Sequence, residues 1–191
     1  MPVLTVIAGP NGSGKSTLMR ALDFEGRQNL LNPDDVAVEL SPENPEKAAF
    51  AAGRRVLERT REYLQMGVSF AIETTLSSKQ NIATLRNARE SGFQVRLIYV
   101  ALDDPERNIF RVKERVASGG HNVSDVDVRR RYQRSLANAV EALRIAHEAI
   151  VYDNSGLQHR KVLELRNSAV TWQAAEKPEW VSELYEALVR V

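Results

Sequence analysis

The sequence contains no cysteine, and histidine occurs three times among its 191 residues. The absence of cysteine excludes a disulfide framework and a thiol nucleophile, and His121, His147 and His159 are too scattered to suggest a zinc site. Long apolar runs are also missing, since the N-terminal run VLTVIAG lacks a basic leader and falls short of the roughly 20 residues that span a bilayer. We therefore expect a soluble, cytoplasmic protein with no membrane partner.

The chain also lacks an excess of charge of either sign. Lysine and arginine number 26 against 25 aspartates and glutamates, which gives a net charge of +1, and aromatic residues make up 6% of the chain. This balance provides no overall field to attract nucleic acid, and few aromatic side chains are present as platforms for base stacking. We predict no nucleic-acid partner, so any positively charged site has to be local.

Short apolar segments rich in β-branched residues alternate with segments of helical spacing. The predicted strands cover residues 3–9, 29–32, 68–75, 93–102, 149–155, 161–166 and 169–173. The predicted helices cover residues 15–23, 34–40, 45–67, 78–92, 105–118, 124–148 and 178–191. This alternation favours a three-layer α/β fold with a mainly parallel sheet covered on both faces. We predict a single domain over residues 1–191, with a lid at about 105–135 and a C-terminal extension at about 157–191.

The stretch GPNGSGKST lies between the first predicted strand and the first predicted helix and matches the phosphate-loop pattern GxxxxGK[ST]. Glycines in such a loop allow successive backbone N–H groups to turn inward on a phosphate. Lys15 would bridge the β- and γ-phosphates, and the hydroxyl of Ser16 would bind Mg²⁺. The sequence thus predicts a site for ATP or GTP with Mg²⁺. The predicted nucleotide-binding residues are Gly9, Pro10, Asn11, Gly12, Ser13, Gly14, Lys15, Ser16 and Thr17.

Segments typical of other P-loop proteins are missing. We find no NKxD-like guanine-specificity element and no apolar run that ends in a plain Asp-Glu pair. A compact P-loop kinase needs less, namely a carboxylate for the acceptor hydroxyl, a pocket for the acceptor and cations that cover the transferring phosphoryl group. The predicted fold class is therefore a kinase-type P-loop NTPase with a helical lid.

The predicted lid consists of two helices joined by a glycine elbow at Gly119 and Gly120. Its arginines are Arg111 and Arg115 on the first helix and Arg130, Arg131 and Arg134 on the second. Closure of such a lid would expel water, and one or two of these arginines would stabilise the charge of the transition state. The alternative is that they form an ordinary solvated helix face.

Several motifs in order resemble the zeta toxin family, the kinases of bacterial toxin–antitoxin systems. They are GPNGSGKST, NPDD, IETTLSS, RVKERVASGGHNV with RRRYQRSLAN, and YDNS, within about residues 3–156. The GGHxV element followed by RRYxRS is the most distinctive, whereas the phosphate loop is generic. The resemblance implies an ATP-dependent kinase that phosphorylates the 3′-hydroxyl of the aminosugar in UDP-N-acetylglucosamine, with an antitoxin protein as a candidate partner.

The same resemblance implies roles for residues outside the phosphate loop. Asp34 in NPDD matches the family's aspartate after the second strand, where a carboxylate can accept the proton of the acceptor hydroxyl. The alternative is that Asp34 caps the following helix. Glu73 at the end of a strand would bind the acceptor sugar or a magnesium-bound water, with Thr74 and Thr75 as further contacts, and its alternative is a plain surface carboxylate.

Arg115 and Arg131 match lid arginines on either side of the glycine elbow and join Lys15 and Asp34 as predicted catalytic residues. His121 would contact a phosphate or fix the elbow by hydrogen bonds. Family sequences commonly have proline where this chain has Ser124, which makes the elbow less rigid but retains a helix cap.

Four further interpretations stay open at this point. Asn154 is a weak candidate for a contact with adenine, and Trp172 and Trp180 are expected to be packing residues. The acceptor could be another sugar, a nucleoside or an antibiotic in place of a nucleotide sugar. The protein could also be an ATP-binding module without kinase activity.

Overall fold

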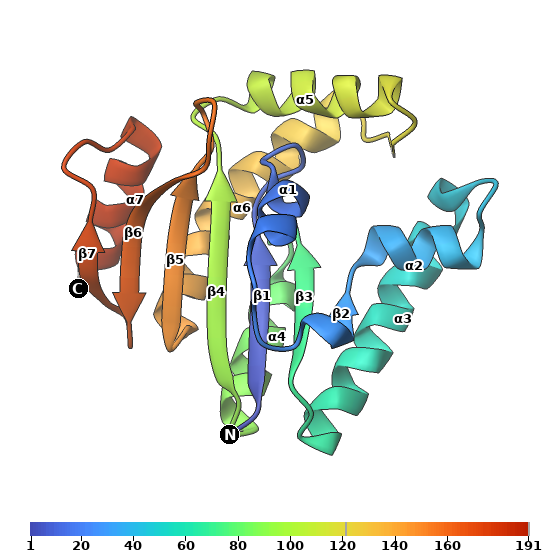
Figure 1. The fold of residues 1–191 in the computed structure, drawn as a ribbon, viewed down its shortest axis with the longest axis horizontal. Coiled ribbons are helices and arrows are strands. Elements are labelled where there is room, and N and C mark those ends of the chain that lie inside the picture. Colours follow the sequence, from blue (N-terminus) through green and yellow to red (C-terminus); the bar gives the residue numbers. More distant parts are fainter. Residues whose placement is uncertain (121, 191) are drawn as a thin grey trace.

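The computed structural model describes residues 1–120 and 122–190, and its centre is a seven-stranded sheet with the order β2-β3-β1-β4-β5-β6-β7 (Figure 1). The strands are β1 (Val3–Ala8), β2 (Leu30–Leu31), β3 (Phe70–Thr74), β4 (Gln94–Ala101), β5 (Glu148–Asp153), β6 (Arg160–Arg166) and β7 (Ala169–Gln173). Strands β2, β3, β1, β4 and β5 pair in parallel, whereas β6 and β7 add an antiparallel edge. The chain therefore has the mainly parallel sheet that the sequence predicts.

Helices cover both faces of this sheet, which confirms the three-layer α/β fold (Figure 1). They are α1 (Lys15–Ala21), α2 (Pro33–Leu40), α3 (Pro45–Met66), α4 (Lys79–Glu90), α5 (Pro105–Ala117), α6 (Asp125–Ile145) and α7 (Glu179–Val189), with a short 3₁₀ helix at Arg27–Asn29. Helix α1 packs on one face, and α4, α6 and α7 pack on the other (Figure 1). In the described part of the chain, no helix is long and apolar enough to cross a membrane.

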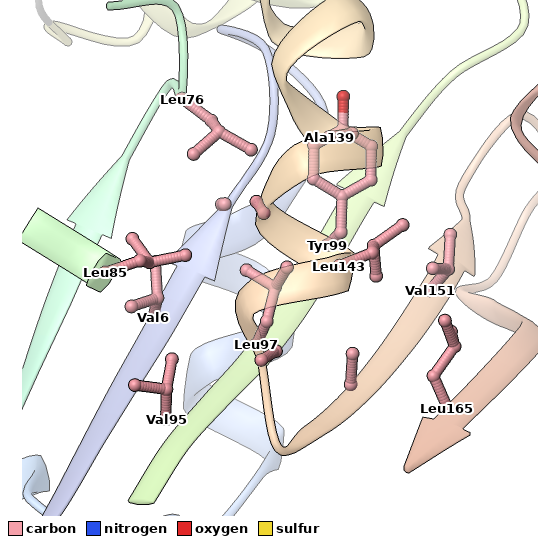
Figure 2. Close-up of a cluster of buried hydrophobic side chains, with 14 of the residues drawn as sticks. Val6, Leu76, Leu85, Val95, Leu97, Tyr99, Ala139, Leu143, Val151 and Leu165 are labelled. Carbon is pink, nitrogen blue, oxygen red and sulfur yellow. The ribbon is translucent and has the colours of Figure 1, made fainter. Parts of the chain in front are cut away.

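The two faces of β1 belong to two different cores because successive side chains of a strand point to opposite sides. Leu4 and Val6 are buried in the large core under α4 and α6, whereas Ile7 packs with Met19 of α1. On the neighbouring strand β4, Tyr99 points into the large core beside α6 (Figure 2). Its hydroxyl shares a hydrogen bond of 3.0 Å with Ser135. β1 therefore lies inside the sheet, between β3 and β4, with both of its faces covered.

The predicted helix starts agree with the structure where a polar side chain precedes the helix. Ser78, Asp104 and Ser124 each accept a hydrogen bond from a backbone N–H in the first turn of α4, α5 and α6 respectively. The predicted end of α6 at about Glu148 is wrong, because the helix ends at Ile145. Glu148 instead begins β5 and pairs with Arg96 of β4. The spacing of apolar residues alone would have allowed the helix to continue, but pairing with the sheet makes this segment a strand.

The C-terminal extension is a β6–β7 hairpin followed by α7, as the sequence predicts. Trp180 is buried and its indole N–H donates to Asp153 at 3.3 Å, which agrees with a packing role. Trp172 does not have the predicted packing role, because it is 42% exposed on the edge strand β7. The ammonium group of Lys161 lies 4.5 Å from the centre of its ring. The extension thus packs through one tryptophan and exposes the other.

Candidate active site

The phosphate loop connects β1 to α1 at the carboxyl end of the sheet (Figure 1). Strand β1 lies between β3 and β4, so the strand order reverses there, which is where open α/β sheets bind ligands. Gly12 and Gly14 have φ values of 73° and 94°, which glycine adopts without steric cost. Gly9 also has to be glycine, because a Cβ atom there would lie 1.9 Å from the carbonyl oxygen of Val100. Local backbone chemistry and close packing therefore shape this loop together.

Lys15 begins α1 with its ammonium group folded back over the loop. Its Nζ atom donates to the carbonyl oxygens of Gly9 at 2.9 Å and Pro10 at 3.0 Å, and lies 3.9 Å from Oε1 of Glu73. Burial lowers the pKa of Lys15 from its ordinary value, and the carboxylate of Glu73 partly opposes this effect. The arrangement keeps a desolvated cation at the mouth of the loop, beside the N-terminus of α1.

Ser16 and Glu73 place two oxygen ligands together where β3 ends. The hydroxyl of Ser16 donates to Oε1 of Glu73 at 3.5 Å, and the side-chain amide of Asn32 donates to Oε2 at 3.2 Å. Burial raises the pKa of Glu73 from its ordinary value even though the nearby charge of Lys15 lowers it. Glu73 is thus a half-buried, hydrogen-bonded carboxyl group and not the plain surface carboxylate of the alternative interpretation.

Mg²⁺ fits this pair of oxygen ligands. The ion prefers hard oxygen donors, keeps several waters and usually takes one or two protein ligands beside substrate phosphates. A full protein cage is not required, and in the described residues no cluster of three or more His, Cys, Asp or Glu side chains forms one. Ser16 and Glu73 are therefore suited to hold Mg²⁺ together with a bound nucleoside triphosphate.

Asp34 is exposed on the second residue of α2 and lines the same cleft as Lys15 and Glu73. The alternative that Asp34 caps α2 is wrong, because the cap is Asn32, whose side-chain oxygen accepts from the N–H of Asp34 at 2.9 Å. Partial burial raises the pKa of the adjacent Asp35, and the charge of Asp34 adds to this effect. Because Asn32 caps the helix, the carboxylate of Asp34 remains available to a molecule in the cleft.

The lid helices bring three of the five predicted arginines to the cleft. Arg111, Arg115 and Arg131 line it, whereas Arg130 and Arg134 are not among its lining residues. Arg130 pairs instead with Asp127 one turn away, at 2.6 Å on the exposed side of α6. For Arg130 the solvated-face alternative therefore holds. His121, which we predicted to contact a phosphate or fix the elbow, lies outside the described residues.

The cleft has a volume of about 1070 Å³, and its lining residues include the phosphate loop after β1, the end of β3 and residues of α5 such as Arg111. Thr74 and Thr75 both line it. The hydroxyl of Thr74 also accepts from the N–H of Leu76 at 3.1 Å, and that of Thr75 shares a hydrogen bond with Ser77 at 2.8 Å. Every predicted site residue that the structure describes outside the loop itself, namely Asp34, Glu73, Thr74, Thr75, Arg115 and Arg131, lies on this one cleft.

The sequence does not predict several of the polar residues around the cleft, or it predicts another role for them. Asn154 was a candidate for adenine, but it is buried and its amide donates to the carbonyl oxygen of Ser13 at 2.9 Å. Asn108 and His159 contact the loop in the same manner, and no local pattern marks either of them. Ser77 and Ser78 could have been found, since they follow a predicted strand directly, on the side of the sheet where ligands bind.

Comparisons with known proteins define the class to which this fold and cleft belong. A chain from the PezAT chromosomal toxin–antitoxin system of Streptococcus pneumoniae superposes with a TM-score of 0.59 at 16% identity, over 98% of this chain and 84% of that one. A chain from the AvrRxo1-ORF1:-ORF2 complex with ATP gives a TM-score of 0.60 at 15% identity, over 98% of this chain but 63% of that one. Together with the phosphate loop, these similarities define a P-loop kinase-like fold.

Sequence comparison then gives the family. The chain belongs to the AAA domain family, whose model matches residues 4–138. It is also 37% identical to an uncharacterized protein of Haemophilus influenzae over 124 residues, which is 65% of this chain and 88% of that protein. The residues that the family model matches include the phosphate loop and most of both lid helices, so the candidate site lies almost entirely within the family region.

Proposed function

We propose that the protein is an ATP-dependent phosphotransferase of the zeta toxin type, built as a single kinase domain over residues 1–191 with a lid at about 105–135. One observation carries the proposal. Lys15 of the phosphate loop, the carboxylates of Asp34 and Glu73 and the lid arginines Arg115 and Arg131 all line one cleft at the carboxyl end of the sheet. A kinase needs these groups in one place, because phosphoryl transfer depends on positioning and on compensation of charge.

In the proposed reaction the γ-phosphoryl group of ATP moves to a hydroxyl group of the acceptor. The bond between the γ-phosphorus and the bridging oxygen breaks, a bond from the acceptor oxygen to that phosphorus forms, and ADP leaves. Asp34 accepts the hydroxyl proton, and its exposed carboxylate in the cleft suits this role. Lys15, Arg115 and Arg131 stabilise the negative charge on the transferring group.

Mg²⁺ would support this chemistry by neutralising charge on the phosphate oxygens of the nucleotide. Ser16 would be a direct ligand, and Glu73 would hold one of its waters or contact the acceptor. The backbone N–H groups of the loop and the N-terminus of α1 would bind the phosphates themselves.

For the acceptor we propose a nucleotide sugar, UDP-N-acetylglucosamine, phosphorylated on the 3′-hydroxyl of its aminosugar. The support is the ordered set of zeta-toxin-like motifs, together with a fold shared with a chain of the PezAT system. The same similarity supports a role as the toxin of a toxin–antitoxin pair, with an antitoxin protein as partner, in the cytoplasm.

A second candidate is a kinase of the same mechanism that acts on a smaller hydroxylated acceptor, such as a sugar or an antibiotic. One observation favours it. Among the described residues that line the cleft there is no phenylalanine, tyrosine or tryptophan to stack on a uracil base, and the one aromatic ring there, that of His159, is hydrogen-bonded to the phosphate loop. The side chains near β3 and α4 instead carry hydroxyl and amide groups, such as Ser77, Ser78 and Asn81.

Mass spectrometry separates these candidates. With ATP, Mg²⁺ and UDP-N-acetylglucosamine, the wild-type protein should yield a product heavier by one phosphoryl group. Asp34→Ala should abolish this transfer while leaving ATP affinity intact, because Asp34 acts on the acceptor, and Lys15→Ala serves as the inactive control. Turnover with another acceptor from a cell extract, and none with the nucleotide sugar, would establish the second candidate. ATP binding without transfer to any acceptor would leave a nucleotide-binding module.

A further inference from the structure

The outward-facing carbonyl groups of the phosphate loop are held by side chains from other parts of the fold. Asn108 of α5 is fully buried and donates its amide to the carbonyl oxygen of Asn11 at 2.6 Å. Asn154, directly after β5, donates to the carbonyl oxygen of Ser13 at 2.9 Å. The third contact comes from the end of the same connection between β5 and β6, so two segments far from the phosphate loop in the sequence hold it, namely α5 and this connection.

That third contact is made by His159, whose Nε2 atom lies 3.1 Å from the carbonyl oxygen of Gly14. A carbonyl oxygen can only accept, so Nε2 carries the proton in this hydrogen bond. The same carbonyl oxygen also accepts the backbone N–H of Leu18 at 3.0 Å, as part of the first turn of α1. Carbonyl groups of the loop at residues 11, 13 and 14 are therefore all fixed by donors on the outside of the loop.

Because of the geometry of the peptide unit, fixing these carbonyl groups also fixes the direction of the N–H groups in the same peptide units. A trans peptide unit is planar, and its C=O and N–H bonds point in opposite directions. If the carbonyl groups of Asn11, Ser13 and Gly14 point outward, the N–H groups of the residues that follow point inward. Those N–H groups belong to Gly12, Gly14 and Lys15, which lie where the loop faces the cleft.

Steric contacts reinforce the same orientation. A Cβ atom on Gly12 would lie 2.5 Å from the carbonyl oxygen of Asn108, so the backbone of α5 rests directly on the loop. A Cβ atom on Gly14 would lie 2.3 Å from the amide nitrogen of Asn154 and 3.0 Å from Nε2 of His159. The glycines are thus required by the neighbouring donors and their elements as well as by backbone conformation.

We propose that Asn108, Asn154 and His159 form a collar around the phosphate loop and act as positioning residues that aim its N–H groups at the phosphates of the nucleotide. Preorganised donors bind an anion without paying for their own reorientation. In this proposal the three collar residues act through the backbone of the loop, and Asn154 and His159 also line the edge of the cleft. The inference rests on the proposed function, because it assumes that the cleft binds a nucleoside triphosphate.

The collar also connects the loop to the lid. Asn108 is part of the lid helix α5, and Arg111, one turn further along, donates to the carbonyl oxygen of Asn154 at 3.0 Å. From the second lid helix, Arg131 donates to the side-chain oxygen of Asn11 at 3.4 Å. These two arginines of the cleft are consequently positioned against the same few residues that fix the loop.

Isothermal titration with ATP and Mg²⁺ tests the collar. Asn154→Asp keeps the shape of the side chain but replaces the donor with a carboxylate that repels the carbonyl oxygen of Ser13. We expect the ATP dissociation constant to rise at least tenfold, and likewise for Asn108→Asp. Asn29→Asp is the matched control, because Asn29 donates to the carbonyl oxygen of Ser69 at 2.9 Å at the opposite end of β3. Its ATP affinity should stay within twofold of wild type.

His159 provides a second pair of variants in case the buried asparagines do not tolerate substitution. His159→Gln retains an amide donor and should preserve ATP affinity, whereas His159→Leu removes the donor and should weaken ATP binding several-fold. Rescue by glutamine but not by leucine is a result that loss of packing alone would not give. Equal affinity of both variants with the wild type would remove His159 from the collar.

Backbone NMR of the ligand-free protein separates failure of the collar from failure of the proposed function. We expect ordered N–H vectors at Gly12 and Gly14 in the wild type and in Asn29→Asp, and clearly lower order parameters in Asn154→Asp and His159→Leu. Unchanged order in the collar variants would overturn the inference even if ATP binds. Lower order in a protein that binds no ATP would keep the collar and refute the proposed function.

Discussion

The phosphate loop and the glycine elbow of the lid both contain closely spaced glycines, yet they are held in opposite ways. A Cβ atom on Gly9 would lie 1.9 Å from the carbonyl oxygen of Val100 in the sheet, whereas one on Gly119 would meet nothing within 4 Å and the three atoms nearest to one on Gly120 would all belong to Arg115, five residues earlier. The loop is tied by hydrogen bonds to buried side chains, such as that of Asn108, but the outer part of the predicted lid is joined by exposed ion pairs, such as Lys113 with Asp125 at 2.9 Å. Such exposed pairs contribute little to stability, because water and salt screen them.

From this difference we expect a rigid loop that binds the phosphate donor and a proposed lid that adjusts to the substrate. At the base of the lid, a small cluster of Ile109, Val112 and Val128 joins α5 to α6. Beyond it, the described residues that approach the elbow are mostly half-buried or exposed. We therefore expect a substrate to move the outer part of the proposed lid at low cost, while the phosphate loop stays preorganised.

The largest expected effect tests whether the lid takes part in chemistry at all. Arg131→Ala should lower turnover by about 10³-fold if the guanidinium group stabilises the transferring phosphoryl group, with a much smaller change in ATP affinity. Arg130→Ala is the matched control one residue away, because Arg130 pairs with Asp127 outside the cleft and should change turnover less than twofold. Steady-state kinetics with ATP and the acceptor would measure both. A drop under tenfold for Arg131→Ala would make it a surface residue like Arg130.

A pair of glycine substitutions tests the rigidity of the loop against that of the elbow. Gly9→Ala should lower the free energy of unfolding by about 3 kcal/mol or more, since unfavourable backbone angles combine with overpacking against Val100. Gly119→Ala should cost about 1–2 kcal/mol, because its φ of 86° is unfavourable for alanine but the space around it is open. Urea unfolding of both variants gives the comparison. An equal decrease in the free energy of unfolding of the two variants would show that the phosphate loop relaxes around a new side chain as readily as the elbow does.

The smallest expected effect concerns the pH dependence of stability. Burial raises the pKa of Glu73 above its ordinary value of 4.5, so the folded protein retains the proton to a higher pH than the unfolded chain does. Stability should fall as pH rises from the ordinary to the raised pKa, by about 1.4 kcal/mol for each pH unit that separates the two values. Above the raised pKa this contribution should be constant.

Glu73→Gln removes the titrating group, so this part of the pH dependence should disappear. Urea unfolding of both proteins between about pH 4 and pH 8 measures the difference, and the free energy of unfolding of the wild type relative to the variant should decrease with rising pH. Parallel profiles would mean that the pKa of Glu73 is the same in the folded and the unfolded protein. The glutamine variant retains the side-chain shape and a polar partner for Asn32.

Much of the fold could be predicted because its signals are local. Helix caps at Ser78, Asp104 and Ser124 depend on a side chain that bonds to the backbone two or three residues ahead, and the strands are marked by continuous apolar runs. The end of α6 could not be predicted, since pairing of Glu148 with Arg96 involves a strand about 50 residues away. The exposed position of Trp172 likewise depends on β7 forming the edge of the sheet.

For the candidate site, the sequence alone determined the phosphate loop and the polar residues at the strand ends, because short-range geometry dictates the spacing of glycines, lysine and serine. Tertiary structure decided which lid arginines reach the cleft: Arg131 faces it and its neighbour Arg130 does not, since adjacent residues of a helix point in different directions. Tertiary structure alone also brings Asn108, Asn154 and His159 to the loop. Each of these side chains contacts a loop residue that is far away in the sequence, so no local sequence pattern predicts the contact.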